Sequence, residues 1–159
     1  MGIVLYRVDE RLIHGQVTVG WGHFLQPRHY LVVDDELSDS EWEKELLRLG
    51  APMDAEVEFL AVEEARQRVG TLQGGEDRVV LLTRDLDHML RLSRGGMLSG
   101  EEINLGGIHH RAGRTEVLPY LFLDDEDRAR IRTLEEEGAT VSAQDLPRAP
   151  KALLGRLLK

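Results

Sequence analysis

Short apolar runs alternate with helical patterns along the whole chain, and this alternation restricts the fold more than any other feature. The segment Val79–Leu82 is apolar on both faces, as expected for a central strand of a parallel sheet. The strand candidates are Ile3–Val8, Tyr30–Val33, Val57–Leu60, Val79–Thr83, Ile103–Leu105, Val117–Leu123 (interrupted by Pro119) and Thr140–Ala143. This order predicts an α/β fold with a single doubly wound, mainly parallel sheet and helices on both faces.

Helix start and stop signals lie between the strand candidates. Capping residues precede each apolar periodic pattern, and glycines follow it. The expected helices run from Ser38 or Ser40 to Gly50, from Glu63 to Gly70, from Asp85 to Gly95-Gly96, and from Asp124 or Asp125 to Gly138. The acidic turn 124–127 is better explained by the helix dipole than by a metal site.

The composition indicates one folded domain, residues 1–159. It also argues against several classes of function. The chain has 42% hydrophobic and 31% charged residues, so disorder is not expected. The absence of cysteine excludes disulfides, thiolate metal sites and thiol catalysis. A net charge of −9 argues against nucleic acid as the main partner. Without a signal-type segment or an apolar run of about 20 residues, the sequence predicts a cytoplasmic protein.

His14 follows the first strand candidate, at the point where a helical pattern through Val17 and Trp21 begins. Arg11 lies three residues earlier, and Gly15 comes next. A strand-to-helix turn presents free backbone N–H groups and the positive end of a helix dipole, which together bind anions. A neutral imidazole there is a nucleophile beside an anion site, with a guanidinium able to grip phosphate. The loop therefore favours a phosphohistidine over a metal site or an acyl-transfer site.

Acidic residues near His14 are open to two interpretations. Asp9 or Glu10 can orient His14 through a hydrogen bond, or can simply neutralise Arg7 and Arg11. After the second strand candidate, Asp34-Asp35 lies at the same predicted sheet edge. Asp35 in particular is a candidate to pair with Arg11 or to bind the His14 loop, with helix capping or solvation as the alternative.

The segment Asn104–His110 ends the fifth strand candidate and contains Gly106-Gly107. The glycines permit positive φ or a close approach of another group. His109 and His110 are adjacent, so on a strand-like segment they point to opposite faces, and no metal site is predicted.

The tail 148–159 has four cations and no acid, with leucines at helical spacing. It is expected to form a basic amphipathic helix docked on the domain's own sheet, with a partner or membrane surface as the alternative.

These motifs resemble a known family. Arg7–Val17 followed by Trp21 is similar to the active-site motif of the IIB component of the mannose/fructose/sorbose family of sugar phosphotransferase systems (PTS). The likeness continues in order through Val32–Glu36, Ala51-Pro52, Val62–Ala65, Asn104–His109 and Gly138–Val141. The second-strand motif departs from the family's usual Asn-Asp, because this chain has Asp34-Asp35.

The resemblance implies a cytoplasmic phosphocarrier that needs no bound cofactor and no metal. His14 accepts phosphate from a phosphohistidine on a IIA protein, with Nδ1 as the expected nitrogen. Arg11, Gly15 and Gln16 hold the phosphoryl group, and Asp9 or Asp35 orients the ring. The phosphate then passes to a sugar held by the membrane subunits IIC and IID, where the carrier associates peripherally.

The chain begins at the first strand candidate, so the IIA donor is expected to be a separate protein. Its docking surface should surround the His14 loop and should be small and short-lived. The residues expected to supply it are Arg7 or Arg11, Leu12-Ile13 and the segment Gly106–Arg114, with Arg111 and Arg114 attracting an acidic rim. A homo-oligomer is also compatible with the sequence, and the sugar is not specified.

Two rival functions remain open. A regulatory module would keep the phosphohistidine but pass phosphate to no sugar. A metal-dependent hydrolase would use His14, Asp9, Asp35 and His109.

Overall fold

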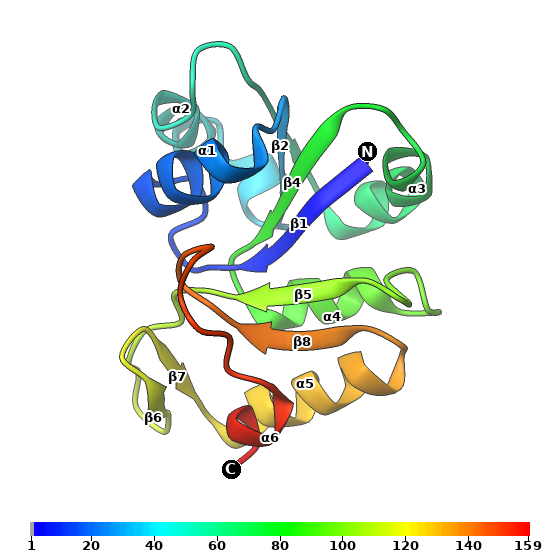
Figure 1. The fold of residues 1–159 in the computed structure, drawn as a ribbon. Helices are drawn as coiled ribbons and strands as arrows, with labels where there is room; N and C mark the ends of the chain where they lie inside the picture. Colours follow the sequence, from blue (N-terminus) through cyan, green and yellow to red (C-terminus); the bar gives the residue numbers. More distant parts are fainter. Residues whose placement is uncertain (1) are drawn as a thin grey trace.

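A six-stranded parallel sheet forms the centre of the molecule in the computed structural model, which describes residues 2–159 (Figure 1). Its strand order is β3-β2-β4-β1-β5-β8, and every neighbouring pair is parallel. The strands are β1 (Gly2–Val8), β2 (His29–Val33), β3 (Glu56–Leu60), β4 (Arg78–Thr83), β5 (Glu102–Leu105) and β8 (Thr140–Ala143). The predicted fold class is confirmed, including the central position of the apolar strand β4.

Helices cover both faces of the sheet. The helical elements are η1 (Gln16–Trp21), α1 (Gly22–Leu25), η2 (Leu37–Asp39), α2 (Glu41–Leu49), α3 (Val62–Gln73), α4 (Leu86–Ser93), α5 (Asp125–Glu136) and α6 (Leu154–Leu157). Buried residues of α3, α4 and α5 share one apolar cluster with Leu31 and Leu81 of the sheet. Val17 and Trp21 of η1 share a second cluster with Val80 on the opposite face. The two clusters bury the sheet from both sides.

The segment 117–123 forms a hairpin instead of the single strand predicted from its apolar residues. Strands β6 (Thr115–Leu118) and β7 (Leu121–Leu123) pair antiparallel on either side of Pro119. Proline has no N–H for a sheet ladder and is favoured in turns, so the interruption by Pro119 reverses the chain.

The C-terminal tail forms a shorter helix than the predicted 148–159. Only α6 is helical, and Ala152 makes an antiparallel bridge with Ala143 at the edge of β8. Leu157 is buried in the main core, whereas Leu153 is 65% exposed. The tail therefore docks on its own domain, but through an extended segment that ends in one helical turn.

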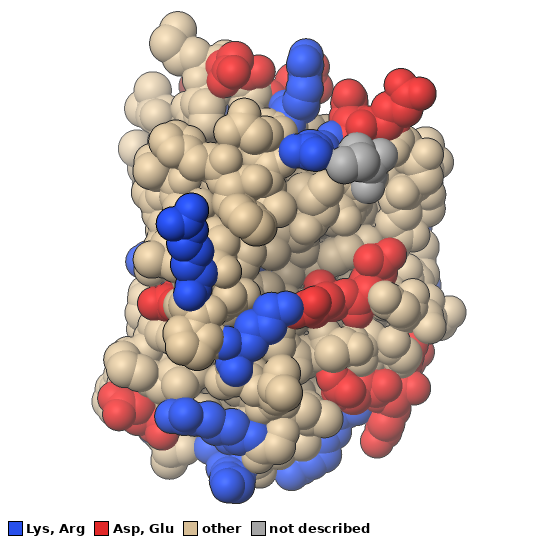
Figure 2. Space-filling view, viewed as in Figure 1, with Lys and Arg blue, Asp and Glu red and all other residues tan. Residues whose placement is uncertain are grey.

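Cations of the tail remain at the surface. In Figure 2, Lys and Arg side chains are spread over the lower part of the face that carries the C-terminal segment. Lys151 forms an ion pair of 2.6 Å with Glu102 of β5, which fastens the extended part of the tail to the sheet. Within residues 2–159, no helix is both long and apolar enough to cross a membrane.

Candidate functional site

The loop after β1 lies at the carboxyl edge of the sheet, between the ends of β4 and β5. Asp9 N–H donates to Thr83 O at 2.9 Å, and Glu10 N–H donates to Gly107 O at 2.8 Å. In open parallel sheets this edge is the usual place for ligands. The backbone thus fixes the beginning of the loop to both neighbours of β1.

Leu12 turns the chain back through a left-handed conformation with φ of 58°. Such a φ is uncommon for a residue with a Cβ and is held only where the surroundings enforce it. Here Leu12 N–H donates to Asp9 O at 3.0 Å, and the Leu12 side chain is 1% exposed in the second apolar cluster. Burial of Leu12 therefore sets the direction in which His14 leaves the loop.

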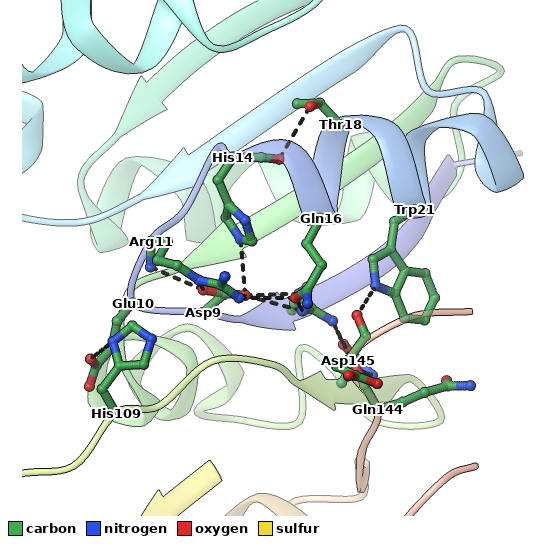
Figure 3. A network of polar contacts seen from close by, with 12 residues as sticks. Asp9, Glu10, Arg11, His14, Gln16, Thr18, Trp21, His109, Gln144 and Asp145 are labelled. Atoms are coloured by element: carbon green, nitrogen blue, oxygen red, sulfur yellow. Dashed lines mark hydrogen bonds and ion pairs between the residues drawn. The ribbon is translucent and has the colours of Figure 1, made fainter. Parts of the chain in front are cut away.

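His14 contacts Asp9 through one defined ring nitrogen (Figure 3). Its Nε2 lies 3.1 Å from Asp9 Oδ2, while the His14 side chain is 16% exposed and Asp9 is fully buried. Burial alone raises the pKa of the Asp9 carboxyl. The hydrogen bonds from His14 and Arg11 and the charge of Arg7 outweigh this effect, so the pKa is held well below its usual range.

An ionised carboxylate only accepts hydrogen bonds, so the proton of a neutral His14 ring is on Nε2. The lone pair is then on Nδ1, the nitrogen that does not contact Asp9. Of the two interpretations of the acidic pair, the structure supports an orienting contact by Asp9, which also forms ion pairs with both arginines.

Arg11 grips the same carboxylate from the solvent side. Its Nε donates to Asp9 Oδ1 and its Nη2 to Asp9 Oδ2, both at 3.2 Å, and its side chain is 38% exposed. Arg11 Nη2 also donates to Gln16 Oε1 at 2.9 Å. Arg11 therefore lies at the surface of the site, with its guanidinium engaged by the protein.

Gly15 and Gln16 begin the helix directly after His14. The backbone N–H groups of residues 13–16 donate to no acceptor within the described residues 2–159. A side chain on Gly15 would meet nothing within 4 Å, so the backbone there is open. The predicted cluster of Arg11, His14, Gly15 and Gln16 is brought together by the fold, with Asp9 beneath it.

The glycines after β5 are needed for close approach, one of the two reasons predicted for them. A Cβ on Gly106 would lie 2.3 Å from Arg7 Nη2, and one on Gly107 would lie 3.0 Å from Arg11 Nη2. The first contact would displace the buried Arg7 guanidinium, whereas the second would need the partly exposed Arg11 to shift by only a few tenths of an ångström. The loop after β5 thus forms the wall of the site.

Asp35 does not contact Arg11 or the His14 loop, so that prediction is wrong. Its Oδ1 accepts the N–H of Val62 at 2.9 Å, and its Oδ2 pairs closely with Arg91. Asp34 is buried and accepts from the backbone of the turn that begins η2. Both acids follow β2, which β4 separates from β1, and they stabilise that part of the sheet edge instead.

Several residues expected to form the docking surface are buried. Arg7, Leu12 and Ile13 are 0%, 1% and 5% exposed. The side chain of Arg114 is 8% exposed and binds Glu10 at 2.8 Å, whereas that of Arg111 is 70% exposed. The predicted docking role is wrong for the buried residues, because the loop folds its apolar pair inward.

His109 binds Glu10, with Nδ1 3.1 Å from Oε2, and His110 packs edge-on against Phe122. Within residues 2–159, the one grouping of three potential metal ligands is Asp85, Asp87 and His88, which share no residue with the His14 network. The hydrolase interpretation therefore has no geometric basis among the described residues.

Sequence reasoning missed the buried polar layer beneath the site. Arg7 contacts Asn104 and the backbone of Gln144, and Trp21 Nε1 donates to Asp145 O at 2.8 Å (Figure 3). One signal was available, because Arg7 is a charged residue inside an otherwise apolar strand.

Comparisons with known proteins agree with this fold. A family model described as the PTS system sorbose subfamily IIB component matches residues 3–159. The sorbose-specific EIIB component of Klebsiella pneumoniae is 30% identical over 138 residues, which cover 87% of this chain and 84% of that protein. The crystal structure of the IIBSor domain of the sorbose permease from the same organism superposes with a TM-score of 0.87 at 27% identity, covering 99% of this chain and 96% of that one.

A longer relative has the same region in a larger protein. The mannose-specific EIIAB component of Escherichia coli K12 is 29% identical over 151 residues, which cover 95% of this chain but 46% of that protein. The family match extends over nearly the whole chain and includes the His14 loop. The chain therefore belongs to the sorbose subfamily of IIB components of the sugar phosphotransferase system, which are phosphotransferase-type transferases.

Proposed function

We propose that the protein is a phosphocarrier in which His14 Nδ1 accepts a phosphoryl group from a phosphohistidine of a IIA protein and donates it to a sugar. The observation that carries the proposal is the contact of His14 Nε2 with the buried Asp9 carboxylate, 3.1 Å away. This contact keeps the proton on Nε2 and the lone pair on Nδ1, the ring nitrogen that does not contact Asp9.

The charges around His14 suit the transfer. In the first step, the Nδ1 lone pair forms a bond to phosphorus while the bond from phosphorus to the donor imidazole breaks, and its electron pair stays with the donor. The His14 ring then carries a positive charge, because both nitrogens are substituted. Asp9 lies against Nε2 and stabilises this charge, as carboxylates do for catalytic histidines.

The resting site has a net charge of plus one, from the two arginines and Asp9. A transferred phosphoryl dianion and the imidazolium that it creates together bring the site to neutrality. The site is therefore electrostatically prepared for the phosphorylated state, and catalysis consists mainly of positioning and charge neutralisation.

Arg11, Gly15 and Gln16 are proposed to hold the phosphoryl group. Gln16 Oε1 already accepts from both arginines, so its amide N–H groups are free to donate to phosphate. The backbone N–H groups of residues 13–16 add donors at the positive end of the helix that follows. Arg11 is exposed enough to turn toward the phosphate with two parallel hydrogen bonds.

The proposed partners are a phosphorylated IIA protein as donor and the membrane subunits IIC and IID with bound sugar as acceptor. The name of the E. coli mannose-specific EIIAB component supports a IIA donor, since the matched region is less than half of that protein. Relatives are named for sorbose, mannose and N-acetylgalactosamine, so the sugar is left open. The carrier is proposed to work at the cytoplasmic face of the membrane.

The test is transfer from a purified, phosphorylated IIA protein, followed by ³¹P NMR. Wild-type protein should gain an acid-labile phosphohistidine on Nδ1, and His14→Ala should gain none. His109→Ala is the control, because it removes another exposed imidazole at the same sheet edge. Equal labelling of His14→Ala would exclude His14 as the acceptor. Phosphorylation without onward transfer in membranes that contain IIC and IID would instead indicate a regulatory module.

A further inference from the structure

Arg7 is a fully buried cation whose donors are all used. Its Nε and Nη2 donate to Asp9 Oδ2 at 3.3 and 3.1 Å, and Nη2 donates also to Gln16 Oε1 at 3.1 Å. Its Nη1 donates to Asn104 Oδ1 at 2.5 Å and to Gln144 O at 2.9 Å. A guanidinium has five N–H groups, so every one of them has an acceptor.

The surroundings leave this guanidinium one position. The centroid of the Trp21 ring lies 5.5 Å from Arg7 Cζ, and the backbone of Gly106 is so close that a Cβ would lie 2.4 Å from Cζ. Asn104 belongs to β5, and Gln144 directly follows β8. The guanidinium is thus anchored to β5 and to the residue after β8.

Arg7 and His14 share one acceptor atom. Asp9 Oδ2 accepts from Arg7 Nε and Nη2 and also from His14 Nε2. The position of Oδ2 relative to the ring therefore depends on where Arg7 holds it. Arg11 also binds Asp9, but it lies at the surface and is the cation proposed to turn toward phosphate. When Arg11 turns away, Arg7 remains as the cation that holds Oδ2.

We propose that Arg7 is a positioning residue that keeps His14 in the Nε2–H tautomer, by fixing Asp9 Oδ2 against Nε2 while Arg11 is engaged with phosphate. The inference rests on the proposed function, since it assigns the two arginines of the site to separate tasks. Arg11 binds the incoming group, and Arg7 keeps the nucleophilic nitrogen unprotonated and aimed at it. The requirement for room around Arg7 explains the glycine at position 106.

Two variants test the proposal in the full-length protein. Arg7→Lys keeps the charge but replaces the planar fork with a single ammonium. Gly106→Ala keeps Arg7 and all charges but places a methyl group 2.3 Å from Arg7 Nη2, which must displace the guanidinium. Gly70→Ala is the matched control, because a Cβ at that position meets nothing within 4 Å.

The decisive readout is the ¹⁵N NMR spectrum of the His14 imidazole, recorded with His109→Ala as the assignment control. Wild-type protein and Gly70→Ala should show only the Nε2–H tautomer of the neutral ring. Arg7→Lys and Gly106→Ala should show a mixture of both tautomers. Their phosphorylation by phospho-IIA should be slower by about 10²-fold at saturating donor, as expected for a misplaced reacting group, with little change in KM.

Even if neither variant folds, the wild-type spectrum can refute the proposal, because a mixture of tautomers in wild-type protein would overturn it. Pure Nε2–H tautomer and normal rates in Gly106→Ala or Arg7→Lys would overturn it as well. Failure of the proposed function is distinct from both results, because then wild-type protein itself would not be phosphorylated on His14. Potassium phosphoramidate, a small N–P donor that needs no docking, separates loss of His14 reactivity from loss of IIA binding.

Discussion

Replacing Asp9 by asparagine removes one negative charge from a fully buried side chain while nearly preserving its shape. The carboxylate accepts hydrogen bonds from Arg7, Arg11 and His14, and asparagine can accept at one oxygen only. The NH₂ group of the asparagine would face N–H donors of the residues that now bind the carboxylate. The substitution therefore tests whether Asp9 is the centre of the site or one contact among many.

The expected loss of stability follows from the burial of Arg7. Breaking a buried ion pair by removing one partner typically costs about 3–5 kcal/mol. That is a large part of the roughly 5–15 kcal/mol that stabilises a domain of this kind, so Asp9→Asn should fold but unfold more easily. Because the pKa of Asp9 is lowered by folding, its contribution is present above the unfolded-state pKa of about 3.9 and is lost as the pH falls below it.

The expected loss of activity follows from the tautomer. An asparagine amide facing His14 Nε2 would donate a hydrogen bond and favour the proton on Nδ1, the proposed nucleophile. The loss of the negative charge also removes stabilisation of the phosphorylated ring. Changing the aspartate of a serine protease triad to asparagine lowers kcat about 10⁴-fold for the same reason, and we expect a loss of about 10³–10⁴-fold here.

The assays are urea unfolding between pH 3 and 8 and single-turnover transfer from phospho-IIA. The difference in unfolding free energy between wild type and Asp9→Asn should be about 3–5 kcal/mol near neutral pH and should shrink as the pH falls below about 4. Glu10→Gln is the control, since Glu10 also binds cations but does not contact His14. A transfer rate of Asp9→Asn within tenfold of wild type would refute this account of the site.

Substitutions at Arg11, Leu12 and Leu157 test the exposed arginine and two apolar contacts, with Leu153 as an exposed control. In single-turnover kinetics, Arg11→Ala should raise the barrier to transfer by a few kcal/mol, and Arg11→Lys should recover only part of the lost rate. Full activity of Arg11→Ala would remove Arg11 from the site. Leu12→Ala should lower the unfolding free energy by about 2–5 kcal/mol in urea, because it leaves a cavity and keeps the left-handed φ. Leu157→Ala should cost a similar amount by calorimetry, whereas the exposed Leu153→Ala should change it by less than about 0.5 kcal/mol; equal effects would contradict the docked tail.

The sequence alone was sufficient for the fold class and for placing His14 in the turn after β1. The apolar strand Val79–Leu82 and the regular alternation of strands and helices require a two-sided parallel sheet, because both faces of such strands must be covered. His14 could be placed at a strand-to-helix turn because the signals are local: an apolar strand precedes it and a helical pattern follows it. The extent of the tail helix was overestimated because leucine spacing does not reveal pairing with β8.

Only the tertiary structure decided which polar side chains meet at His14. Asp9 and Asp35 are equally plausible from the sequence, but β4 lies between the strands that they follow. Arg7 is a site residue only because Asn104 and Gln144, far away in the sequence, supply acceptors in the core. Strand order determines such contacts, and it depends on the packing of the whole sheet. The location of His14 at a turn, in contrast, depends on a few neighbouring residues.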